Sequence, residues 1–459
     1  MKQTVTIFWH RRDLRFDDNA GLYRAQKSVE SNDSDTDNAV LPIFIFDREI
    51  LDKLPEKADA RVMFIRDNVQ KLADHYREMG SDLRAFYGHP LDIWKALLDE
   101  YDVKAIYVNR DYEPYAIARD KAVADLIEAR GGSFHHFKDQ IVFESDEVQK
   151  KAGGPYTVFT PFFRTWKKNL AERMSTLPNG EPVSYYLKPY PNGEYTDRLL
   201  QTKDHQPVPT LDEMGFERAD DFIPPDHVTT GLIKNYDKTR NYPNMEGTTR
   251  LSVHLRHGTI SIREKVRKAL ALNDTFVKEL VFRDFYSNIL QSFPHVVDAP
   301  FRPEYADIPW RNDEAEFKLW CAGKTGVPIV DAGMRQLNES GWMHNRVRMI
   351  VASYLTKHLL IDWRWGEGYF ADKLLDYELA SNNGGWQWAA GCGTDAQPYF
   401  RIFNYDSQQK KFDAKYEYVK EWVPEYGTPD YPAEPLIEHK VGRERALDVY
   451  KTALTAARE

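Results

Sequence analysis

The chain has 459 residues, of which 42% are hydrophobic and 29% are charged, a balance typical of globular proteins with two or three domains. A formal net charge of −9 argues against a surface that binds polyanions throughout, because phosphate binding requires local positive charge. No apolar run approaches the roughly 18 residues of a membrane-spanning helix, so we expect no membrane partner.

The two cysteines, Cys321 and Cys392, are too few for a disulfide framework and lack the spacing of metal ligands. We therefore expect no metal site and a location in the reducing cytoplasm. The short apolar run 5–9 is followed at once by Arg11 and Arg12. This pattern is typical of a strand that leads into a charged loop and not of a signal peptide.

The first 145 residues alternate between strand-like and helix-like segments. Aromatic or β-branched runs predict strands at 5–9, 40–46, 83–87 and 105–108. Apolar periodicity predicts helices at 60–79, 91–101 and 116–130. This alternation predicts an α/β domain with a parallel, doubly wound, Rossmann-like sheet and a ligand crevice at the carboxyl ends of its strands. Neither G-x-G-x-x-G after the first strand nor a P-loop is found, which disfavours an ordinary dinucleotide fold.

Prolines interrupt the following stretch so often that it cannot be one continuous helix or a central strand. They stand at positions 155, 161, 178, 182, 189, 191, 207, 209, 224 and 225. From Thr248 onward the pattern turns helical, with few strand signals. We therefore predict an α/β domain at 1–145, a long linker at 146–230 and an all-α domain at 231–459.

Positive charge is concentrated in one segment of this acidic chain. Residues 236–270 contain eight Lys/Arg and three Asp/Glu. An exposed basic helix face explains this excess, and so does a surface that binds nucleic acid.

The segment 278–286 combines charge and aromatic side chains on one helical face. Glu279, Phe282, Arg283 and Tyr286 follow the spacing i, i+3, i+4, i+7. A buried carboxylate is costly unless it is paired or protonated. Two interpretations stay open: a structural Glu279–Arg283 ion pair, or a carboxyl with a tuned pKa in an active cavity.

A second polar segment, 342–349, opens a helix that we expect to run to about residue 361. Asn345 and Met349 share a face, and Arg346 points about 100° away. These side chains suit a cavity for a flat polar ligand, although an amphipathic helix with a core Met and surface arginines explains them too.

Tryptophan is concentrated toward the end of the chain, where eight of the eleven are found. Trp386 and Trp388 follow Gly384-Gly385, and on a helix they would lie about 200° apart. They must then face different neighbours, which packing into a single core cluster does not explain.

With these segments in view, the chain resembles the DNA photolyase/cryptochrome family, and more narrowly the class I cyclobutane pyrimidine dimer photolyases. The resemblance runs almost from end to end. The motifs that carry it are Trp9–Arg15 with Asp18-Asn19, Phe159-Thr160-Pro161-Phe162, Glu246–Ser252, Gly323–Ala332, Trp342–Met349, Asn382–Ala390 and Gly393–Asn404.

The resemblance implies one U-shaped FAD in the helical domain and a second, antenna chromophore near the α/β domain. That antenna is a methenyltetrahydrofolate, a deazaflavin or a flavin, and the sequence does not choose among them. The implied activity is a lyase reaction in which light drives electron transfer from reduced FAD to a flipped pyrimidine dimer, followed by ring splitting and electron return; base flipping by photolyases is a known general feature. The implied partner is single- or double-stranded DNA that carries a dimer, and we expect a monomer.

The resemblance also assigns roles to residues that match the motifs. Catalytic roles fall to Glu279 and Asn345 as hydrogen-bond partners of the dimer, to Met349 and Trp388 as packing partners, and to Asn382 facing the flavin. Electron transfer falls to Trp386, Trp363 and Trp310. Contacts with FAD fall to Tyr236, Thr248, Thr249, Leu251, Ser252, Phe276, Glu279, Arg283, Trp342, Asn345, Arg348, Asp376, Glu378 and Asn382. DNA contacts fall to Arg240, Phe282, Arg346 and Arg401.

Three positions depart from the pattern of the family. Phe282 and Phe276 stand where many relatives carry Trp, and Glu378 replaces a usual Asp. Phe keeps an aromatic face but has less area, so the affinity for the lesion is open. A signalling cryptochrome would usually carry a C-terminal extension, a (6-4) photolyase would carry His at position 345, and a non-photochemical nucleotide-binding protein would leave the tryptophans unexplained.

Overall fold

The computed structural model describes residues 2–29, 38–220, 223–432 and 434–457. Its contacts divide the chain into two compact units that interleave along the sequence. The first comprises 1–144, 166–226 and 251–271, and the second comprises 145–165, 227–250 and 272–459. The division predicted from the sequence, into 1–145, 146–230 and 231–459, uses continuous ranges. Because the compact units are not continuous in sequence, they do not test that division, and it stays a prediction.

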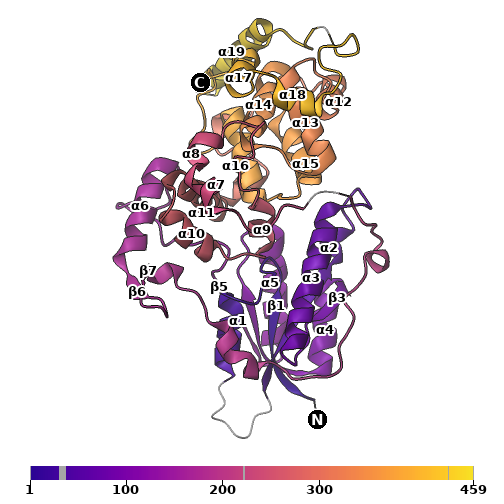
Figure 1. The fold of residues 1–459 in the computed structure, drawn as a ribbon, viewed down its shortest axis with the longest axis vertical. Coiled ribbons are helices and arrows are strands. Elements are labelled where there is room, and N and C mark those ends of the chain that lie inside the picture. Colours follow the sequence, from indigo (N-terminus) through magenta and orange to yellow (C-terminus); the bar gives the residue numbers. More distant parts are fainter. Residues whose placement is uncertain (1, 30–37, 221–222, 433, 458–459) are drawn as a thin grey trace. The chain divides into compact units, whose positions relative to one another are not determined.

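A five-stranded parallel sheet forms the centre of the first unit, with the strand order β3-β2-β1-β4-β5 (Figure 1). Its strands are β1 (Thr4–His10), β2 (Ala39–Asp47), β3 (Arg84–Gly88), β4 (Asp102–Asn109) and β5 (Ser133–Phe137). The predicted α/β class is confirmed, and the first four strands lie where the sequence predicts them. The sequence analysis missed β5, whose two central histidines interrupt its apolar pattern.

Both faces of this sheet are covered by helices. Along β1, Phe8 joins one buried cluster with side chains of α1 (Ala20–Ser28) and α3 (Ala60–Glu78). Its neighbours Ile7 and Trp9 join another with side chains of α4 (Pro90–Glu100) and α5 (Pro114–Glu128). Because successive strand residues point to opposite faces, a strand that is apolar throughout must be buried on both sides.

The predicted helices correspond to α3, α4 and α5, whereas α1 was missed. Helix α1 is short and carries few apolar side chains, and it begins where Asn19 accepts a hydrogen bond from the backbone N–H of Leu22 at 3.1 Å. The described part of the proline-rich stretch contains one regular helix, α6 (Phe159–Glu172), with Pro161 in its first turn, where proline is tolerated. The residues of α6 up to Thr165 belong to the second unit, and those from Trp166 onward belong to the first. The remaining elements of the first unit are α2 (Arg48–Leu51), β6 (Met174–Thr176), β7 (Pro182–Ser184), η1 (Tyr185–Leu187), η2 (Asn192–Arg198), η3 (Asp212–Met214), α9 (Ser252–His257) and α10 (Ile262–Leu270).

Helices α9 and α10 belong to the first unit although they are remote from the sheet in sequence. Arg263 of α10 is almost fully buried, and its guanidinium pairs with Asp18 at 2.9 Å and with Asp139 at 2.8 Å. Gly258, with φ +65°, approaches so closely that a Cβ would lie 2.1 Å from the carbonyl oxygen of Arg12. A buried ion pair and a close backbone contact therefore attach this segment to the α/β fold.

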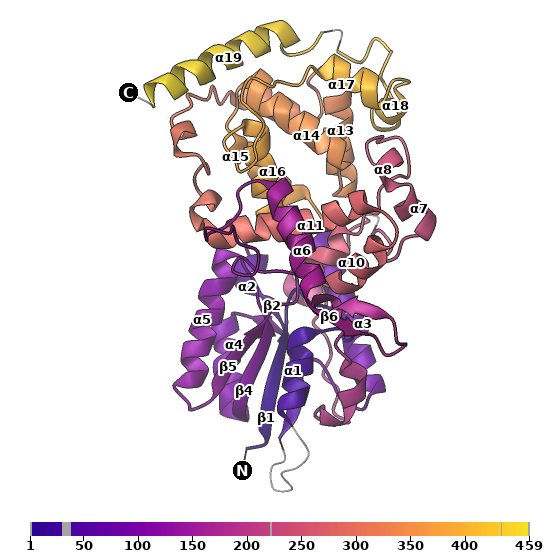
Figure 2. The same cartoon turned by 90° about the vertical axis from the view of Figure 1, so that its left-hand side faces the viewer.

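The second unit is helical, as the sequence predicts from residue 248 onward. Its helices are α7 (Thr230–Lys234), α8 (Tyr236–Thr239), α11 (Asp274–Ser292), η4 (Pro294–Val297), η5 (Pro303–Tyr305), α12 (Glu314–Cys321), α13 (Pro328–Ser340), α14 (Asn345–Ser353), η6 (Tyr354–Leu359), α15 (Trp363–Lys373), α16 (Leu379–Ala390), α17 (Tyr405–Phe412), α18 (Glu417–Trp422) and α19 (His439–Ala456). Helices α13 and α14 pack side by side (Figure 2). In the described part of the chain, no helix combines the length and the apolar character that crossing a membrane requires.

The helix predicted to run from residue 342 to about 361 is divided. Helix α14 begins at Asn345 and passes into the π-helical turn η6, which ends before Leu360 in a left-handed conformation with φ +54°. The prediction was therefore right about the extent of the helical segment and missed the change of winding within it.

Loss of the buried guanidinium should destabilise the first unit. We expect Arg263→Met to lower the free energy of unfolding by about 3–5 kcal/mol, because Asp18 would lose its cationic partner while staying buried. Urea unfolding followed by circular dichroism measures this. The matched control is Arg130→Met, which removes an exposed pair with Asp99 and should change stability by less than about 1 kcal/mol. Equal effects of the two substitutions would contradict the role given to the buried pair.

Candidate functional site

Helix α11 is the longest helix of the described second unit and brings several predicted residues together. Its buried residues include Phe276, Leu280 and Phe285, whereas Glu279 and Phe282 are half-buried. It contacts both α8 and α16. The helix is therefore surrounded by protein while one face, which carries charge and aromatic rings, stays in reach of a ligand.

Glu279 pairs with Arg240 of the segment that follows α8. Of the two interpretations that the sequence left open, the structural pair between Glu279 and Arg283 is wrong, because Arg240 is the cation that meets this carboxylate. Burial raises the pKa of Glu279 above its usual value, while Arg240, Arg346 and Lys278 oppose that rise. The result is a carboxyl whose protonation is controlled by a neighbouring arginine.

Two further ion pairs connect predicted residues from separate elements. Arg283 of α11 pairs with Glu378, which precedes α16, at 3.4 Å. Arg348 of α14 pairs with Asp376 at 3.0 Å and also donates to the backbone carbonyl of Met343 at 2.8 Å. Together these pairs tie α11 and α14 to the chain that leads into α16.

Aromatic side chains lie beside these charges. Tyr236 is buried against Phe276, with ring centroids 5.1 Å apart. The guanidinium of Arg250 lies 4.5 Å from the centroid of Trp342, which is half-buried. Arg250 has φ +49°, so the loop after Thr248 and Thr249 turns sharply at this point. The rings thus form part of the wall, and both threonines remain half-exposed next to them.

Helix α14 presents Asn345 at its first turn. Its side chain is exposed, that of Met349 is half-buried, and the two share a helical face. Arg346 donates to Asn241 at 2.7 Å and lies over Phe412, so it reaches a separate partner as predicted. Its guanidinium does not stay clear of Met349, however, because it also donates to the sulfur of that residue at 3.5 Å. Asn345 is therefore open to a ligand, whereas Met349 is partly covered by the guanidinium of Arg346.

The amide of Asn382 has a defined orientation. Its Nδ2 donates to the backbone carbonyl of Glu367 at 3.1 Å and to the carboxyl of Glu367 at 2.9 Å. Both donors of the amide are thereby used within the protein, which leaves the side-chain carbonyl oxygen as the acceptor that Asn382 offers to a ligand.

Trp386 and Trp388 lie on the same helix, α16, and point in different directions. Trp386 is buried against Phe370, at 5.0 Å between ring centroids, and against Trp320, at 6.1 Å. Trp388 is half-buried. Trp388 nevertheless packs against the core cluster that contains Trp386, so the prediction that one cluster does not account for both rings is wrong.

Trp363 and Trp310 belong to the aromatic region around Trp386. Trp363 is buried in the same core cluster as Trp386, and Trp310 packs against that cluster while remaining half-exposed. Trp310 also meets Tyr450 edge to face at 5.9 Å. A graded series from a buried to a half-exposed tryptophan is therefore present in one cluster.

Several predicted residues are not joined to this group by a described side-chain interaction, among them Arg401, Leu251 and Ser252. Arg401 is exposed. Leu251 is buried next to the start of α9, and Ser252 is the first residue of that helix. Leu251 and Ser252 fall in the first compact unit, so their expected roles stay predictions.

Several buried donors in the second unit have no acceptor among the described residues. They are the Nε groups of Arg250 and Arg346 and the Nε2 of His344. His344 accepts a hydrogen bond from the backbone N–H of Arg346 through Nδ1, which places its proton on Nε2. Burial and the arginines around it lower the pKa of His344 to about 3. Since buried donors normally find partners, this site fits an acceptor-rich nucleotide cofactor.

Some of these partners were missed by the sequence analysis. Glu367, Asn241 and Tyr286 lie outside the motif positions that received roles, although Tyr286 was placed on the correct helical face. A Cβ at Gly384 would lie 2.2 Å from the ring of Tyr286, so only glycine fits there. Their sequence signals are weak, because a hydrogen-bond partner distant in sequence leaves no local pattern.

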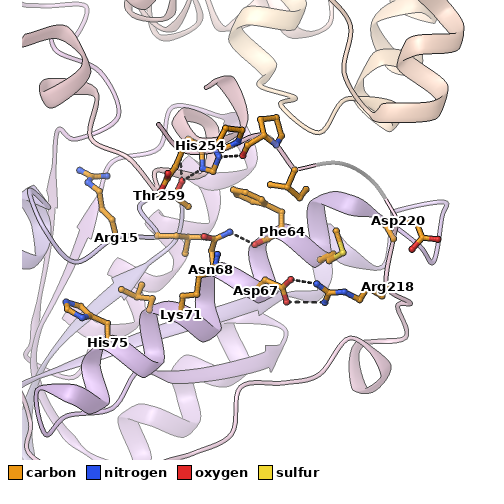
Figure 3. A pocket seen from close by; sticks show the side chains of 18 residues that line it. Arg15, Phe64, Asp67, Asn68, Lys71, His75, Arg218, Asp220, His254 and Thr259 are labelled. Atoms are coloured by element: carbon orange, nitrogen blue, oxygen red, sulfur yellow. Dashed lines mark hydrogen bonds and ion pairs between the residues drawn. The ribbon is translucent and has the colours of Figure 1, made fainter. Parts of the chain in front are cut away.

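The carboxyl end of the sheet, where the sequence analysis placed a ligand crevice, is occupied by side chains of the chain itself. Arg11 pairs with Asp120, Arg12 pairs with Asp111 at 3.1 Å, and Arg119 lies 4.7 Å from the centroid of Trp9. The first unit has a cavity of about 800 Å³ beside α3, to which the segment that follows β1 contributes Leu14 and Arg15 (Figure 3). Within the described chain, its lining includes none of the predicted site residues, and its volume is typical of small-molecule sites.

Comparison with protein families places two known domains on this chain. The model of the FAD binding domain of DNA photolyase matches residues 276–430, and the DNA photolyase model matches residues 6–182. A deoxyribodipyrimidine photo-lyase of Halobacterium salinarum is 37% identical over 98% of this chain and 99% of the relative. One from Synechococcus is 36% identical over 99% and 98%.

Two solved photolyase structures are similar to this chain over almost its whole length. A bacterial class III photolyase from Agrobacterium tumefaciens superposes with a TM-score of 0.80 at 31% identity, covering 99% of this chain and 98% of that chain. An archaeal photolyase from Sulfolobus tokodaii, solved with two FAD molecules, superposes with a TM-score of 0.79 at 33% identity over 98% and 100%. The narrower resemblance to class I enzymes stays a prediction.

Removal of Arg240 should change the titration of Glu279. We expect Arg240→Gln to raise the pKa of Glu279 further, because the strongest influence that opposes burial is lost. The carboxyl C=O stretch in infrared spectra, with Glu279→Gln as the reference, gives the titration midpoint. Lys278→Gln removes the weakest of the three opposing cations and should shift the midpoint less. An unchanged midpoint in Arg240→Gln would contradict the coupling.

Proposed function

This chain belongs to the DNA photolyase family, and we propose that it splits cyclobutane pyrimidine dimers in DNA in a lyase reaction driven by light. The observation that carries the proposal is the position of Glu279. A half-buried carboxyl with a raised pKa lies on the same helical face as Phe282 and is paired with an arginine that phosphate can compete for. This arrangement suits recognition of a base inside the protein and of a DNA backbone beside it.

The cofactor is FAD, and the residues of the second unit that would hold it are those of the connected polar group. We assign this role to Tyr236, Thr248, Thr249, Phe276, Arg283, Trp342, Arg348, Asp376, Glu378 and Asn382. When bound, FAD supplies the light-driven electron on which the reaction depends. Asn382 offers a carbonyl oxygen as an acceptor, because Glu367 occupies both of its amide hydrogens. Asp376 pairs with Arg348 and Glu378 pairs with Arg283, so the two carboxylates hold these arginines in place.

Glu279 and Asn345 would bind the dimer, with Met349 and Trp388 packed against it. In the free protein, Arg240 favours the ionised form of Glu279. If a DNA phosphate draws Arg240 away, the strongest of the cations that oppose burial is lost, and the pKa of Glu279 rises further. The protonated Glu279 then donates a hydrogen bond to a pyrimidine carbonyl on which negative charge develops, which stabilises that charge in a water-poor site.

Arg240, Arg346 and Arg401 would contact the DNA backbone. Arg401 is exposed, and Arg346 is held by the amide of Asn241 rather than by a described carboxylate. Phosphate oxygens are strong acceptors for guanidinium groups, so these arginines provide positive charge locally on an acidic chain. Phe282 would provide the aromatic face next to the lesion.

Trp386, Trp363 and Trp310 would conduct electrons inward from the surface. The series leads from the buried Trp386 to the half-exposed Trp310 within one packed cluster. Tyrosine and tryptophan both recur in this cluster, but an indole at each of these three positions is a costly choice for a core, because its N–H needs a partner.

Further features of the proposal concern the whole protein. A second chromophore would act as an antenna, and its chemical identity stays open. We infer that the chain acts as a monomer. We also infer that it is located in the cytoplasm, because both cysteines are free and a reducing compartment suits free cysteines.

The direct test of this function is repair of a dimer-containing oligonucleotide by the reduced holoenzyme under blue light. We expect undamaged thymines to appear in the light and none to appear in the dark, as measured by chromatography of the digested DNA. Dimers that remain intact after illumination of reduced, FAD-loaded enzyme would overturn the proposal.

Glu279→Ala should lower the quantum yield of repair by roughly tenfold or more, because the developing charge loses its hydrogen-bond donor. The absorption spectrum should show that FAD remains bound. Glu264→Ala, which removes a carboxylate paired with Lys268 in the first unit, is the control and should leave the yield unchanged. Release of FAD from Glu279→Ala with no loss of yield per bound FAD would make the role of Glu279 structural.

Trp310→Phe should block light-driven reduction of the bound FAD and spare repair by enzyme that was reduced chemically beforehand. The two measurements are absorption changes under illumination with an external thiol and repair in the presence of dithionite. Trp422→Phe changes another half-buried tryptophan packed against the same cluster and should leave both unchanged. Undiminished photoreduction in Trp310→Phe would remove this residue from the electron path.

A further inference from the structure

We propose that Phe159 is a positioning residue for recognition of the pyrimidine dimer, which acts by holding the ring of Phe282 in a fixed plane. This inference rests on the proposed function. Phe159 is the first residue of α6 and is 7% exposed. It received no role in the sequence analysis beyond its place in a motif.

The two rings are in close face-to-face contact. The centroids of Phe159 and Phe282 lie 3.6 Å apart, and the ring planes differ by 9°. At this separation no base can enter between them. One face of Phe282 is therefore covered, and only its remaining surface is available to a ligand.

The pair is part of a longer series of nearly parallel rings. Phe163 lies behind Phe159 at 5.8 Å and 16°, and Tyr286 follows Phe282 at 6.1 Å and 25°. The ring of Tyr286 lies directly against Gly384, in space that any larger side chain at position 384 would occupy, and this contact restricts the ring. The series thus joins the first turn of α6 to α11 and α16.

The position of Phe159 is set by its backbone as well. Its N–H donates to the carboxylate of Asp395 at 3.1 Å. Asp395 adopts φ +48°, a left-handed conformation that is uncommon for residues other than glycine. Phe285 closes another side, edge to face with Phe159 at 5.7 Å. Phe159 is therefore held at its backbone and on several sides of its ring.

The physical consequence concerns the size and freedom of a phenyl ring. A lone Phe at position 282 would offer a base less area than an indole and would turn about its χ2 torsion, which has a broad energy well. A parallel ring at 3.6 Å prevents that rotation. Phe159 thereby lowers the entropy that Phe282 would lose on stacking against a lesion.

The experiment measures how well the holoenzyme discriminates between damaged and undamaged DNA. We compare dissociation constants for an oligonucleotide with one dimer and for the same oligonucleotide without it, in the dark, for the unchanged chain and for Phe159→Leu. Leucine keeps most of the buried volume and removes the parallel ring. We expect the dissociation constant for undamaged DNA divided by that for dimer-containing DNA to fall roughly fivefold to tenfold. This change lies at the lower end of the effect of losing one base–aromatic stack. Binding of undamaged DNA should stay unchanged.

Phe163→Leu is the matched control, because it removes a ring from the same series that does not touch Phe282. It should leave the ratio unchanged while altering thermal stability to a similar extent. Phe159→Leu combined with Phe282→Ala should be no worse than Phe282→Ala alone, because Phe159 acts through Phe282. Additive losses in the double variant, or equal losses in Phe163→Leu, would overturn the inference.

Different results would contradict the proposed function and the role of Phe159. If the unchanged chain neither prefers nor repairs dimer-containing DNA, then the proposed function fails. If it does both, and Phe159→Leu discriminates as well as the unchanged chain does, then the function stands and the role of Phe159 is wrong. The absorption spectrum of bound FAD and circular dichroism establish that each variant is folded.

Discussion

A charge that is taken out of water must find an opposite charge or a strong hydrogen bond, and this requirement organises the helical unit around α11. Glu279 and Arg283 lie one helical turn apart, yet each pairs with a residue from another element, Arg240 and Glu378. Because an unpaired buried charge costs several kcal/mol, these pairs restrict how the helices can pack. The first unit follows the same rule, where Arg263 attaches a distant segment to the α/β fold.

The same pairs give the site its chemistry. Arg240 keeps the carboxyl of Glu279 more acidic than burial alone would make it, so the state of that carboxyl depends on what else the arginine binds. Phosphate is such a competitor. Binding of a DNA backbone and protonation of a group beside the base are then linked through one guanidinium, and no movement of a helix is required.

Aromatic side chains serve two purposes that a core of aliphatic residues could not. The parallel rings that lead from Phe163 to Tyr286 hold the plane of Phe282, and Gly384 provides the space that the last of them needs. The tryptophans of α16 divide between a buried side and a half-exposed side because two residues along a helix turn by about 200°. One short helix therefore presents one tryptophan to the interior of a cluster and another to its half-exposed edge.

The sequence by itself determined the class of the fold, and its resemblance to a family indicated the site residues, whose roles stay predictions. Long periodic segments such as 60–79 and strongly apolar strands such as 40–46 follow from local patterns, and both are present as α3 and β2. Three segments were missed: α1 carries few apolar side chains, two histidines interrupt β5, and the amphipathic α6 lies in a proline-rich stretch that was predicted as a linker. The motifs at 278–286, 342–349 and 381–391 identified the polar face of α11, the start of α14 and the tryptophans of α16.

Only the tertiary structure decided the partners of these residues. Helical spacing allowed Glu279 to pair with Arg283. Its partner is Arg240, which lies 39 positions away in the sequence, and no local pattern indicates this pairing. The same is true of Glu367, which orients Asn382, and of Phe159, which covers Phe282. Local patterns report which way a side chain points along its own helix or strand. Which group it meets there depends on how distant segments pack, because that packing is set by the burial of the whole core.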